Sequence, residues 1–488
     1  MILNRKLIAK VLSAVAAVVG ASMLLPAIVS AAYGEWDIFN IFLEVGLPVF
    51  AAGQIVMRLI PSQSPDDLRM RDGFFIVGVS WLAMSFIGCL PFMMSGAIPN
   101  FCDAYFETAS GFTTTGSTIL TEIETLPRGI LFWRSFTHWL GGMGVLVLTI
   151  AILPKLGIGG QKIMRAETTG PTMDKISFTV NETARALYKI YMLFTAVEVI
   201  LLCLGGMDLF DSLVHTFGTV GTGGYSSYNA SIGAFHSPYI EWVIAIFMML
   251  CGVNFSLYMN FYRKTPIKMM KDPEFRVYIA ILGGSTIFIT VMLMVNRFYD
   301  TFADTLRTAF FQVSSIMTTT GYGTVDFDLW PLPCRFVLFL LMLIGGCAGS
   351  TGGGMKVIRI ILTLKIIRRG MFRRLHPRAV SPVKVGDSTV AAGTMSGVAG
   401  FVILYLFTTV FSTLLISLEN VSFTTALSSV VACLSNIGPG FEAVGPTQNF
   451  AFYSGPAKIL LSLLMIAGRL ELFTIILLFT PVYWNRKK

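Results

Sequence analysis

The sequence contains few charged residues: Asp, Glu, Lys and Arg together make up 13% of its 488 positions. Soluble globular domains carry about 25%, so the chain does not have the composition of one. Apolar residues make up 54%, the mean hydropathy is +0.72, and the apolar positions form long uninterrupted blocks. This composition predicts a membrane protein that crosses the bilayer many times.

Cysteine and histidine are also scarce, with seven and four residues respectively, and they are scattered along the chain. No CxxC pair or His/Cys cluster occurs, so neither a zinc motif nor a disulfide framework is indicated. The sequence likewise lacks a nucleophile–base pattern and an acidic pair placed to face a common site. We therefore predict that the protein is not an enzyme and binds no organic cofactor.

What the sequence has instead is a series of apolar segments long enough to cross a bilayer, which takes about 20 residues. Ten passes are predicted, the eighth of them interrupted, at residues 8–32, 39–60, 73–95, 129–153, 186–206, 239–262, 275–297, 333–368, 393–418 and 457–483. The first has a basic start and a "VSA" site, so a cleaved secretory signal is an alternative. We favour a retained helix, because the 22 residues from Val11 to Ala32 exceed a usual signal core.

Positive charge is concentrated in the loops that follow every second pass, and the formal net charge is +9. The clusters lie at Arg5/Lys6/Lys10, Arg58/Arg69/Arg71, Lys155–Lys189, Arg263–Arg276, Lys356–Lys384 and Arg486–Lys488. Under the positive-inside rule these loops and both termini are cytoplasmic. Topology therefore explains the charge without nucleic acid, and we expect the basic loops to contact anionic lipid.

Four outer connections share a second pattern, a short apolar stretch followed by a polar turn that contains glycine. The short stretches lie at 101–112, 209–220, 302–317 and 422–434, and the turns read "TTTGS" (113–117), "GTGGY" (221–225), "TTTGY" (318–322) and "SNIGP" (435–439). The aligned glycines Gly116, Gly224, Gly321 and Gly438 are separated by 108, 97 and 117 residues. A unit of helix, half-helix, polar loop and helix therefore occurs four times.

We predict an all-α protein in which two leading helices (1–72) precede four such repeats, at 73–182, 183–274, 275–391 and 392–488. Non-helical backbone cannot face lipid, because its N–H and C=O groups would go unpaired, so the four loops are expected to converge on one axis. Glycine lets the backbone turn there, and rings of carbonyls can replace the hydration shell of a monovalent cation. The pattern predicts a pore for K⁺ or Na⁺; the alternative is four outer turns or helix-packing faces.

The interrupted eighth pass contains "LIGGCAGSTGGGMKVIR", from Leu343 to Arg359. Each glycine in a helix costs about 1 kcal/mol against alanine, so this segment is expected to be non-helical and to lie under the polar loops. Close helix packing is an alternative. A phosphate-binding loop is disfavoured, because Met355 separates the glycines from Lys356 and no GK[ST] ending follows.

The last pass places two charged residues, Arg469 and Glu471, in an apolar helix. Charges at such a depth usually face a protein interior or water. One reading is a salt bridge between helices, which we favour for Glu471. The other is that Arg469 projects into the pore and opposes cations by roughly 1–4 kcal/mol, depending on the local dielectric.

Together, the four loops, the interrupted pass and the basic residue of the last helix resemble the Trk/Ktr/HKT superfamily of cation transporters, and most closely its bacterial TrkH/TrkG branch. The resemblance covers essentially the whole chain. It implies four M1–P–M2 repeats with pseudo-fourfold symmetry around one pore. The selectivity-filter residues it implies for K⁺ are Thr114, Thr115, Gly116, Thr222, Gly223, Gly224, Thr319, Thr320, Gly321, Asn436, Ile437 and Gly438.

The resemblance also implies a function, which is channel-like potassium uptake across the bacterial inner membrane. Glycine in all four loops implies K⁺ as the transported ion, although the second and fourth loops depart from TTxG. The implied gate is the loop containing Gly345, Gly346, Gly349, Gly352, Gly353, Gly354 and Lys356, with Arg469 as a pore-facing barrier. The implied partners are a second copy of the chain and a cytosolic nucleotide-binding ring of the TrkA type. A secondary transporter coupling K⁺ to H⁺ or Na⁺, with Glu198 or Glu471 as its carboxylate, is the alternative.

Overall fold

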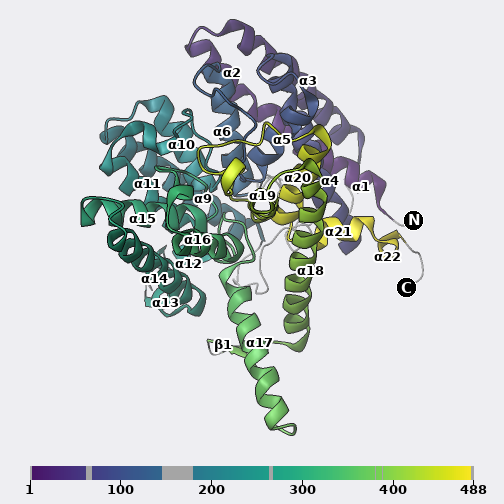
Figure 1. Cartoon of the computed structure of the whole chain (residues 1–488). Helices are drawn as coiled ribbons and strands as arrows, with labels where there is room; N and C mark the ends of the chain where they lie inside the picture. The colour runs from purple at the N-terminus through teal and green to yellow at the C-terminus, as the bar shows by residue number, and fades with distance from the viewer. Residues whose placement is uncertain are drawn as a thin grey trace.

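The computed structural model describes residues 3–61, 69–144, 180–262, 267–379, 381–386 and 388–484, and this part is built almost entirely of α-helices (Figure 1). Several sequence predictions fall partly outside these residues. They are the end of the fourth pass, most of the basic cluster at 155–189, the start of the cluster at 263–276, and the basic C-terminus at 486–488.

The two leading passes form an antiparallel pair, α1 (Arg5–Ser22) continued by α2 (Leu24–Ala32), and α3 (Trp36–Leu59). Small residues let these helices approach closely. A Cβ atom added at Gly20 would lie 2.7 Å from the Gly46 carbonyl oxygen, and one at Gly53 would lie 2.6 Å from that of Ser13. Such packing of small residues is typical of helices associating within a membrane.

The remaining helices repeat one order: a long helix, a short helix, a loop and a second long helix. Repeat 1 contains α4 (Met70–Met94), α5 (Phe101–Phe112) and α6 (Arg128–Gly142); repeat 2 contains α9 (Val180–Leu204), α10 (Leu209–Gly221), η3 (Ser231–Phe235), α11 (Pro238–Cys251) and α12 (Phe255–Tyr262). Repeat 3 contains α13 (Ile267–Lys271), α14 (Pro273–Val295), α15 (Phe302–Met317), η4 (Phe327–Leu329), α16 (Leu332–Ile344) and α17 (Val357–Leu375). Repeat 4 contains α18 (Ala392–Ile416), η5 (Ser417–Glu419), α19 (Phe423–Ser435), η6 (Glu442–Val444), α20 (Gly455–Arg469), α21 (Phe473–Phe479) and α22 (Pro481–Trp484).

Between repeats 3 and 4, α17 projects from the body of the molecule, beside α18 (Figure 1). A small antiparallel hairpin, β1 (Lys384–Val385) with β2 (Ser388–Thr389), follows α17. The sequence prediction contained no strand, because two-residue strands leave no alternating pattern to detect.

Each of the four short helices, α5, α10, α15 and α19, begins at a capping residue. The side chains of Asn100, Asp208, Thr301 and Ser422 accept backbone N–H groups of the first turn. Such caps satisfy donors that a helix start leaves unpaired. They explain why these helices begin within one residue of the predicted short stretches.

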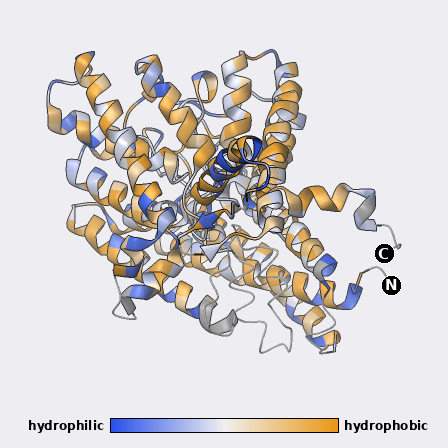
Figure 2. Cartoon of the chain, turned by 90° about the horizontal axis from the view of Figure 1, so that it is seen from below, coloured by the Kyte–Doolittle hydropathy of each residue, from blue (hydrophilic) through white to orange (hydrophobic). Residues whose placement is uncertain are grey.

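The longer helices present apolar side chains outward. On α18, Ile403, Phe407, Val410 and Leu414 recur at helical spacing and are 68%, 66%, 70% and 63% exposed. Six described helices are long and apolar enough to cross a membrane. Figure 2 shows the same orange, hydrophobic colouring over most of the helices and a strongly hydrophilic helix end facing the viewer. Exposed apolar stripes of this kind indicate contact with lipid.

Two passes that were predicted to be continuous are broken. Residues 239–262 form α11 and α12 with a break at Gly252–Asn254, and residues 457–483 form α20 and α21 with a break after Arg469. In the second break, Glu471 and Leu472 both adopt positive φ, at 57° and 60°. All four second helices thus end at a comparable point after their polar loop, which the sequence indicated only for the third repeat.

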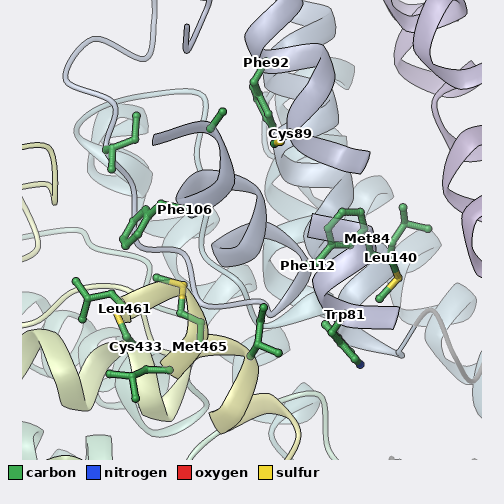
Figure 3. Packing of buried hydrophobic residues seen from close by; sticks show 14 of the residues in the cluster. Trp81, Met84, Cys89, Phe92, Phe106, Phe112, Leu140, Cys433, Leu461 and Met465 are labelled. Atoms are coloured by element: carbon green, nitrogen blue, oxygen red, sulfur yellow. The ribbon is translucent and has the colours of Figure 1, made fainter. Parts of the chain in front are cut away.

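In the largest part of the described core, side chains of α4 and repeat 4 surround the short helix α5. Figure 3 shows Phe106 and Phe112 of α5 with Trp81, Met84, Cys89 and Phe92 of α4 on one side and Cys433, Leu461 and Met465 of repeat 4 on the other. These side chains are at most 1% exposed. The packing positions α5, and with it the start of the polar loop that follows, between α4 and repeat 4.

Candidate functional site

The four polar loops meet in a closed ring. A Cβ atom added to the glycine of each loop would lie within 3.0 Å of a carbonyl oxygen of the next loop: Gly116 against Gly223, Gly224 against Thr320, Gly321 against Ile437, and Gly438 against Thr115. The contacts therefore run from repeat 1 to 2, 2 to 3, 3 to 4 and back to 1. We call these four glycines, each with the two residues that precede it, the glycine ring.

The four loops also share one backbone conformation. The glycines of the glycine ring have φ values of 82°, 79°, 86° and 101° in chain order. The residues two positions earlier, Thr114, Thr222, Thr319 and Asn436, are left-handed as well, with φ values of 55°, 55°, 61° and 58°. Non-glycine residues rarely adopt this region, so its recurrence in four loops indicates a conformation imposed by the assembled ring.

The ring forms the floor of one outer cavity. Gly116, Gly224, Gly321 and Gly438 all line a cavity of about 190 Å³, with Ser117, Tyr225 and Pro439 beside them. On its inner side the ring is buried: the side chains of Thr114, Thr115, Thr222, Thr319, Thr320 and Asn436 are all 0% exposed.

Hydrogen bonds join three of the four loop-to-loop junctions. The Tyr225 hydroxyl lies 3.1 Å from the Ser117 carbonyl, to which it donates, and the Tyr322 hydroxyl donates to the Tyr225 carbonyl at 3.1 Å. Ser117 Oγ donates to the Gly438 carbonyl at 3.0 Å. At the junction between loops 3 and 4 the equivalent position is Pro439, which has no donor to offer. The ring is therefore closed, but its junctions are not equivalent.

Directly beneath the ring lies the non-helical segment that joins α16 to α17, the Gly345–Lys356 loop. The Gly353 N–H donates to Thr319 Oγ1 at 2.6 Å. A Cβ atom added at Gly352 would lie 2.7 Å from the Thr318 carbonyl oxygen, and one at Gly353 would overlap the Ser435 carbonyl oxygen. The loop thus contacts the ring at Thr319 and the residues that immediately precede the ring in repeats 3 and 4, Thr318 and Ser435.

The Gly345–Lys356 loop is fastened at both ends. One carboxylate oxygen of Glu274, at the start of α14, accepts the N–H groups of Ala348 at 2.7 Å and of Ile358 at 3.1 Å. The break between α11 and α12 holds its middle, since the Cys347 N–H donates to the Gly252 carbonyl at 2.9 Å. The ammonium group of Lys356 donates to the Gly352 carbonyl in its own loop, and the side chain is 2% exposed.

Arg469 joins this loop to the opposite side of the molecule. Its guanidinium donates to the Thr351 carbonyl at 2.6 Å and to the carbonyls of Gly141 and Gly142 at 2.8 Å. Thr351 belongs to repeat 3, and the two glycines end α6 in repeat 1. Arg469, in repeat 4, therefore links repeats 1 and 3 on the side of the ring where the Gly345–Lys356 loop lies. The carbonyl end of α6 also favours a positive charge there.

Glu471 faces a different partner, as its spacing from Arg469 suggested. Its carboxylate pairs with the guanidinium of Arg359 in the first turn of α17. Arg359 also lies 4.0 Å from the centre of the Phe401 ring of α18. For Glu471, the salt-bridge reading of the sequence therefore agrees with the geometry.

Two carboxylates, Glu124 and Glu442, lie beside residues that line the outer cavity. Glu124 accepts two hydrogen bonds of 2.7 Å from Asn229, which lines the cavity. Glu442, in the turn η6 at the rim, accepts from the Ser422 hydroxyl, and this bond holds the pKa of Glu442 below its ordinary value. Both carboxylates are outside the spanning helices. A charged carboxylate at the rim attracts cations toward the cavity.

With this geometry established, the chain can be compared with known proteins. The sequence profile of TrkH, described as a cation transport protein, matches residues 48–486. The chain belongs to the TrkH family. The Trk system potassium uptake protein TrkH of Salmonella typhimurium is 40% identical over 469 residues, covering 95% of this chain and 96% of that protein. The corresponding TrkG of Escherichia coli is 35% identical, covering 95% of each chain.

Among solved structures, the crystal structure of the potassium transporter TrkH from Vibrio parahaemolyticus matches with a TM-score of 0.87 and 35% identity. The match covers 99% of this chain and 100% of that one. The predicted family and the predicted all-α, multi-pass membrane fold with two leading helices and four repeats are confirmed. The repeat boundaries, and the roles of the individual residues, stay predictions.

In this TrkH-family chain the structure brings all twelve predicted filter residues into one ring and places the Gly345–Lys356 loop and Arg469 beneath it. It also reveals residues that the sequence reasoning did not assign. Glu107 of α5 and Arg134 of α6 form an ion pair of 2.6 Å behind the ring, with side chains 0% and 2% exposed. Glu274 fastens the Gly345–Lys356 loop. The only sequence signal for these residues was a charge inside or beside an apolar segment.

Proposed function

We propose that this chain mediates potassium uptake across the bacterial inner membrane through a channel-like pore, with the glycine ring as its selectivity filter. The observation that carries the proposal is the closure of the ring, in which each glycine abuts a carbonyl of the next loop. Carbonyls gathered in this way can replace the water around a monovalent cation. The potassium-related names of the TrkH and TrkG relatives support K⁺ as the transported ion.

Further support comes from the chemistry of the ring itself. Its side chains are threonines, one asparagine and one isoleucine, so it offers neutral oxygens without net charge. A divalent cation would favour a ring of carboxylates. The carboxylates near this site lie outside the ring, where they would attract monovalent and divalent cations alike.

We infer that the Gly345–Lys356 loop is the gate and that Arg469 is a fixed positive barrier. Support comes from the bond between the loop and Thr319 of the ring, and from the bonds by which Arg469 joins repeat 4 to repeats 1 and 3. A cation leaving the ring would meet both. Movement of the loop away from Thr319 would open a path without disturbing the ring.

The proposal extends to the assembly. We expect a homodimer with one pore in each copy, both termini in the cytoplasm, and a cytosolic nucleotide-binding ring of the TrkA type on the basic inner face. The relatives are named as parts of a Trk system, which supports a partner of some kind. The basic end of α17 projects from the body of the protein and is accessible to one.

The decisive experiment is recording from the purified chain in a planar bilayer with K⁺ on one side and Na⁺ on the other. We expect unitary currents whose reversal potential shows a higher permeability to K⁺ than to Na⁺, and which reverse near the K⁺ equilibrium potential when both sides hold both ions at unequal concentrations. A flux that requires a proton gradient and shows no unitary current would support the alternative, a secondary transporter. Glu198 is the observation that favours this alternative, because it is a fully buried carboxyl on α9. The variant Glu198→Gln removes this carboxyl. If the protein is a channel, the variant should keep its currents; if it is a coupled transporter, the variant should lose transport.

A further inference from the structure

Behind the glycine ring, a polar contact in each repeat joins the short helix to the chain segment that follows the ring glycine. The position nine residues before the ring glycine is polar in every repeat: Glu107, His215, Gln312 and Ser429. All four side chains are at most 1% exposed. We call them, with their partners, the braces.

In repeats 1 to 3, the brace side chain bonds directly to the chain segment that follows the ring glycine. Glu107 accepts the Ile119 N–H at 2.9 Å, the ring of His215 bonds to Ser226 Oγ at 2.9 Å, and the Gln312 amide donates to Thr324 Oγ1 at 3.3 Å. In repeat 4 the equivalent contact is made by Ser428, the neighbour of Ser429, whose Oγ accepts the Phe441 N–H at 3.0 Å. Each loop is therefore closed at its base by a polar contact.

Within the described residues, the brace of repeat 1 alone is an ion pair. Arg134 Nε lies 2.6 Å from a Glu107 carboxylate oxygen, and both side chains are buried. The pair also reaches the second loop, because Arg134 donates to the Ser226 carbonyl at 2.9 Å. Its guanidinium lies 3.6 Å from the centre of the Tyr225 ring, whose hydroxyl donates to the Glu107 carbonyl at 2.8 Å.

This arrangement lies next to the junction of loops 1 and 2, one of the two closest in the ring. Tyr225 directly follows Gly224, and Ser117 directly follows Gly116, so the two residues linked by the Tyr225 hydroxyl are the neighbours of two ring glycines. Because Gly116 has no free space toward the Gly223 carbonyl, any change in the separation of loops 1 and 2 must move that carbonyl. Arg134 also lines the outer cavity.

We propose that the Glu107–Arg134 pair is a positioning element that sets the separation of loops 1 and 2 and thereby the discrimination of K⁺ from Na⁺. The inference rests on the proposed function, since it assigns a role within the proposed filter. The two residues act through Tyr225 and the Ser226 carbonyl, and neither is proposed to touch the ion.

The test measures the K⁺/Na⁺ permeability ratio from reversal potentials of the full-length protein in bilayers. Glu107→Gln keeps the shape of the side chain and removes its charge, so Arg134 loses its counter-ion. We expect the ratio to fall by roughly threefold or more, the effect that one lost buried hydrogen bond produces in an equilibrium. Arg134→Lys keeps the charge and loses the planar group, so it should give an intermediate ratio.

The matched control is Asp103→Asn. Asp103 lies on the same helix and pairs with Lys458 at 2.6 Å, at the end of α5 remote from the ring. We expect its permeability ratio to equal that of the wild type.

Three outcomes separate the possibilities. The inference is overturned if the wild type selects K⁺ and Glu107→Gln has the same permeability ratio but fewer active channels. The pair would then have a structural role. If Glu107→Gln does not fold, Arg134→Lys decides in the same way, and a wild-type ratio there overturns it. A wild type that does not select K⁺ contradicts the proposed function itself.

Discussion

At the scale of single residues, the glycines of the ring are fixed by contact as well as by conformation. Gly116 has φ +82° and its missing Cβ would fall on the Gly223 carbonyl oxygen. A side chain there must therefore displace a wall of the neighbouring loop. The same holds at Gly224 and Gly321, so the tolerance of the ring to substitution is limited by its neighbours rather than by each loop alone.

We predict that Gly116→Ser lowers the K⁺/Na⁺ permeability ratio, because its Cβ pushes the Gly223 carbonyl away from its place in the ring. The measurement is the reversal potential with K⁺ and Na⁺ on opposite sides. Gly206→Ser is the matched control, since Gly206 has φ +89° but nothing within 4 Å. It carries similar backbone strain without the clash. A ratio unchanged in folded Gly116→Ser would show that this loop is not part of the filter.

Arg469 supports a second prediction at this scale. Arg469→Ala removes a positive charge from beneath the ring, so the unitary K⁺ conductance should rise. A charge a few ångströms from the path opposes a cation by roughly 1–4 kcal/mol, although the carbonyls of Thr351, Gly141 and Gly142 offset part of this. Lys458→Ala, on the same helix but paired with Asp103, should leave the conductance nearly unchanged. Equal or lower conductance in Arg469→Ala would assign the residue a purely structural role.

At the scale of elements, the Gly345–Lys356 loop is held by close backbone contacts that only small residues permit. Gly353 abuts the Ser435 carbonyl, and its N–H is bonded to Thr319. Glu274 and the α11–α12 break hold it as well, through Ala348, Ile358 and Cys347. These contacts tie several parts of the loop at once, so we expect the proposed gate to move as a unit between α16 and α17.

We predict that Gly353→Ala weakens the seating of this loop and raises K⁺ flux in the absence of any cytosolic partner. The added methyl group overlaps the Ser435 carbonyl and must push the loop downward. Flux of the K⁺ analogue Rb⁺ into proteoliposomes measures the effect. Gly370→Ala in α17, where nothing lies within 4 Å, serves as the control. A folded Gly353→Ala protein with flux at or below the wild-type level contradicts the assignment of this loop as the gate.

The elements also show what sequence can and cannot reveal. The predicted stretches 101–112 and 302–317 agree with α5 and α15 in both bounds, because capping residues and polar turns mark their ends locally. The break after Arg469 was missed because Glu471 and Leu472 are ordinary helix residues. Their left-handed conformation accompanies bonds to distant partners, from Arg469 to repeats 1 and 3 and from Glu471 to α17. The Glu107–Arg134 pair was unassigned for the same reason, since its geometry depends on the assembled repeats.

At the scale of the whole molecule, the four repeats enclose a polar centre and expose apolar helices. The stripe on α18 formed by Ile403, Phe407, Val410 and Leu414 faces outward. Its exposure in a single chain implies that lipid or a second copy covers it in the membrane. Lipid and a second copy would both present an apolar surface, so in either case the side chains of the stripe must be apolar.

We predict that Phe407→Arg reduces the amount of correctly inserted protein. An arginine near the centre of a spanning helix costs about 2.5–3.5 kcal/mol for insertion, and Phe407 is 66% exposed on that surface. Fluorescence-detected gel filtration of membrane extracts measures the folded fraction. Leu375→Arg is the control, because Leu375 lies at the basic end of α17 and is 79% exposed. Equal amounts of the two variants would show that the α18 stripe does not meet an apolar environment.

The closed ring is encoded by one continuous chain, and this has an evolutionary consequence. In a ring of four identical subunits, one codon change alters every wall at once. Here a change at Gly116, Gly224, Gly321 or Gly438 alters a single wall, and Pro439 already shows that one junction has diverged from the other three. In the proposed filter, ion preference can therefore change one loop at a time, and selection can act on each change separately. Intermediate selectivities are then accessible that a fourfold-symmetric assembly cannot reach.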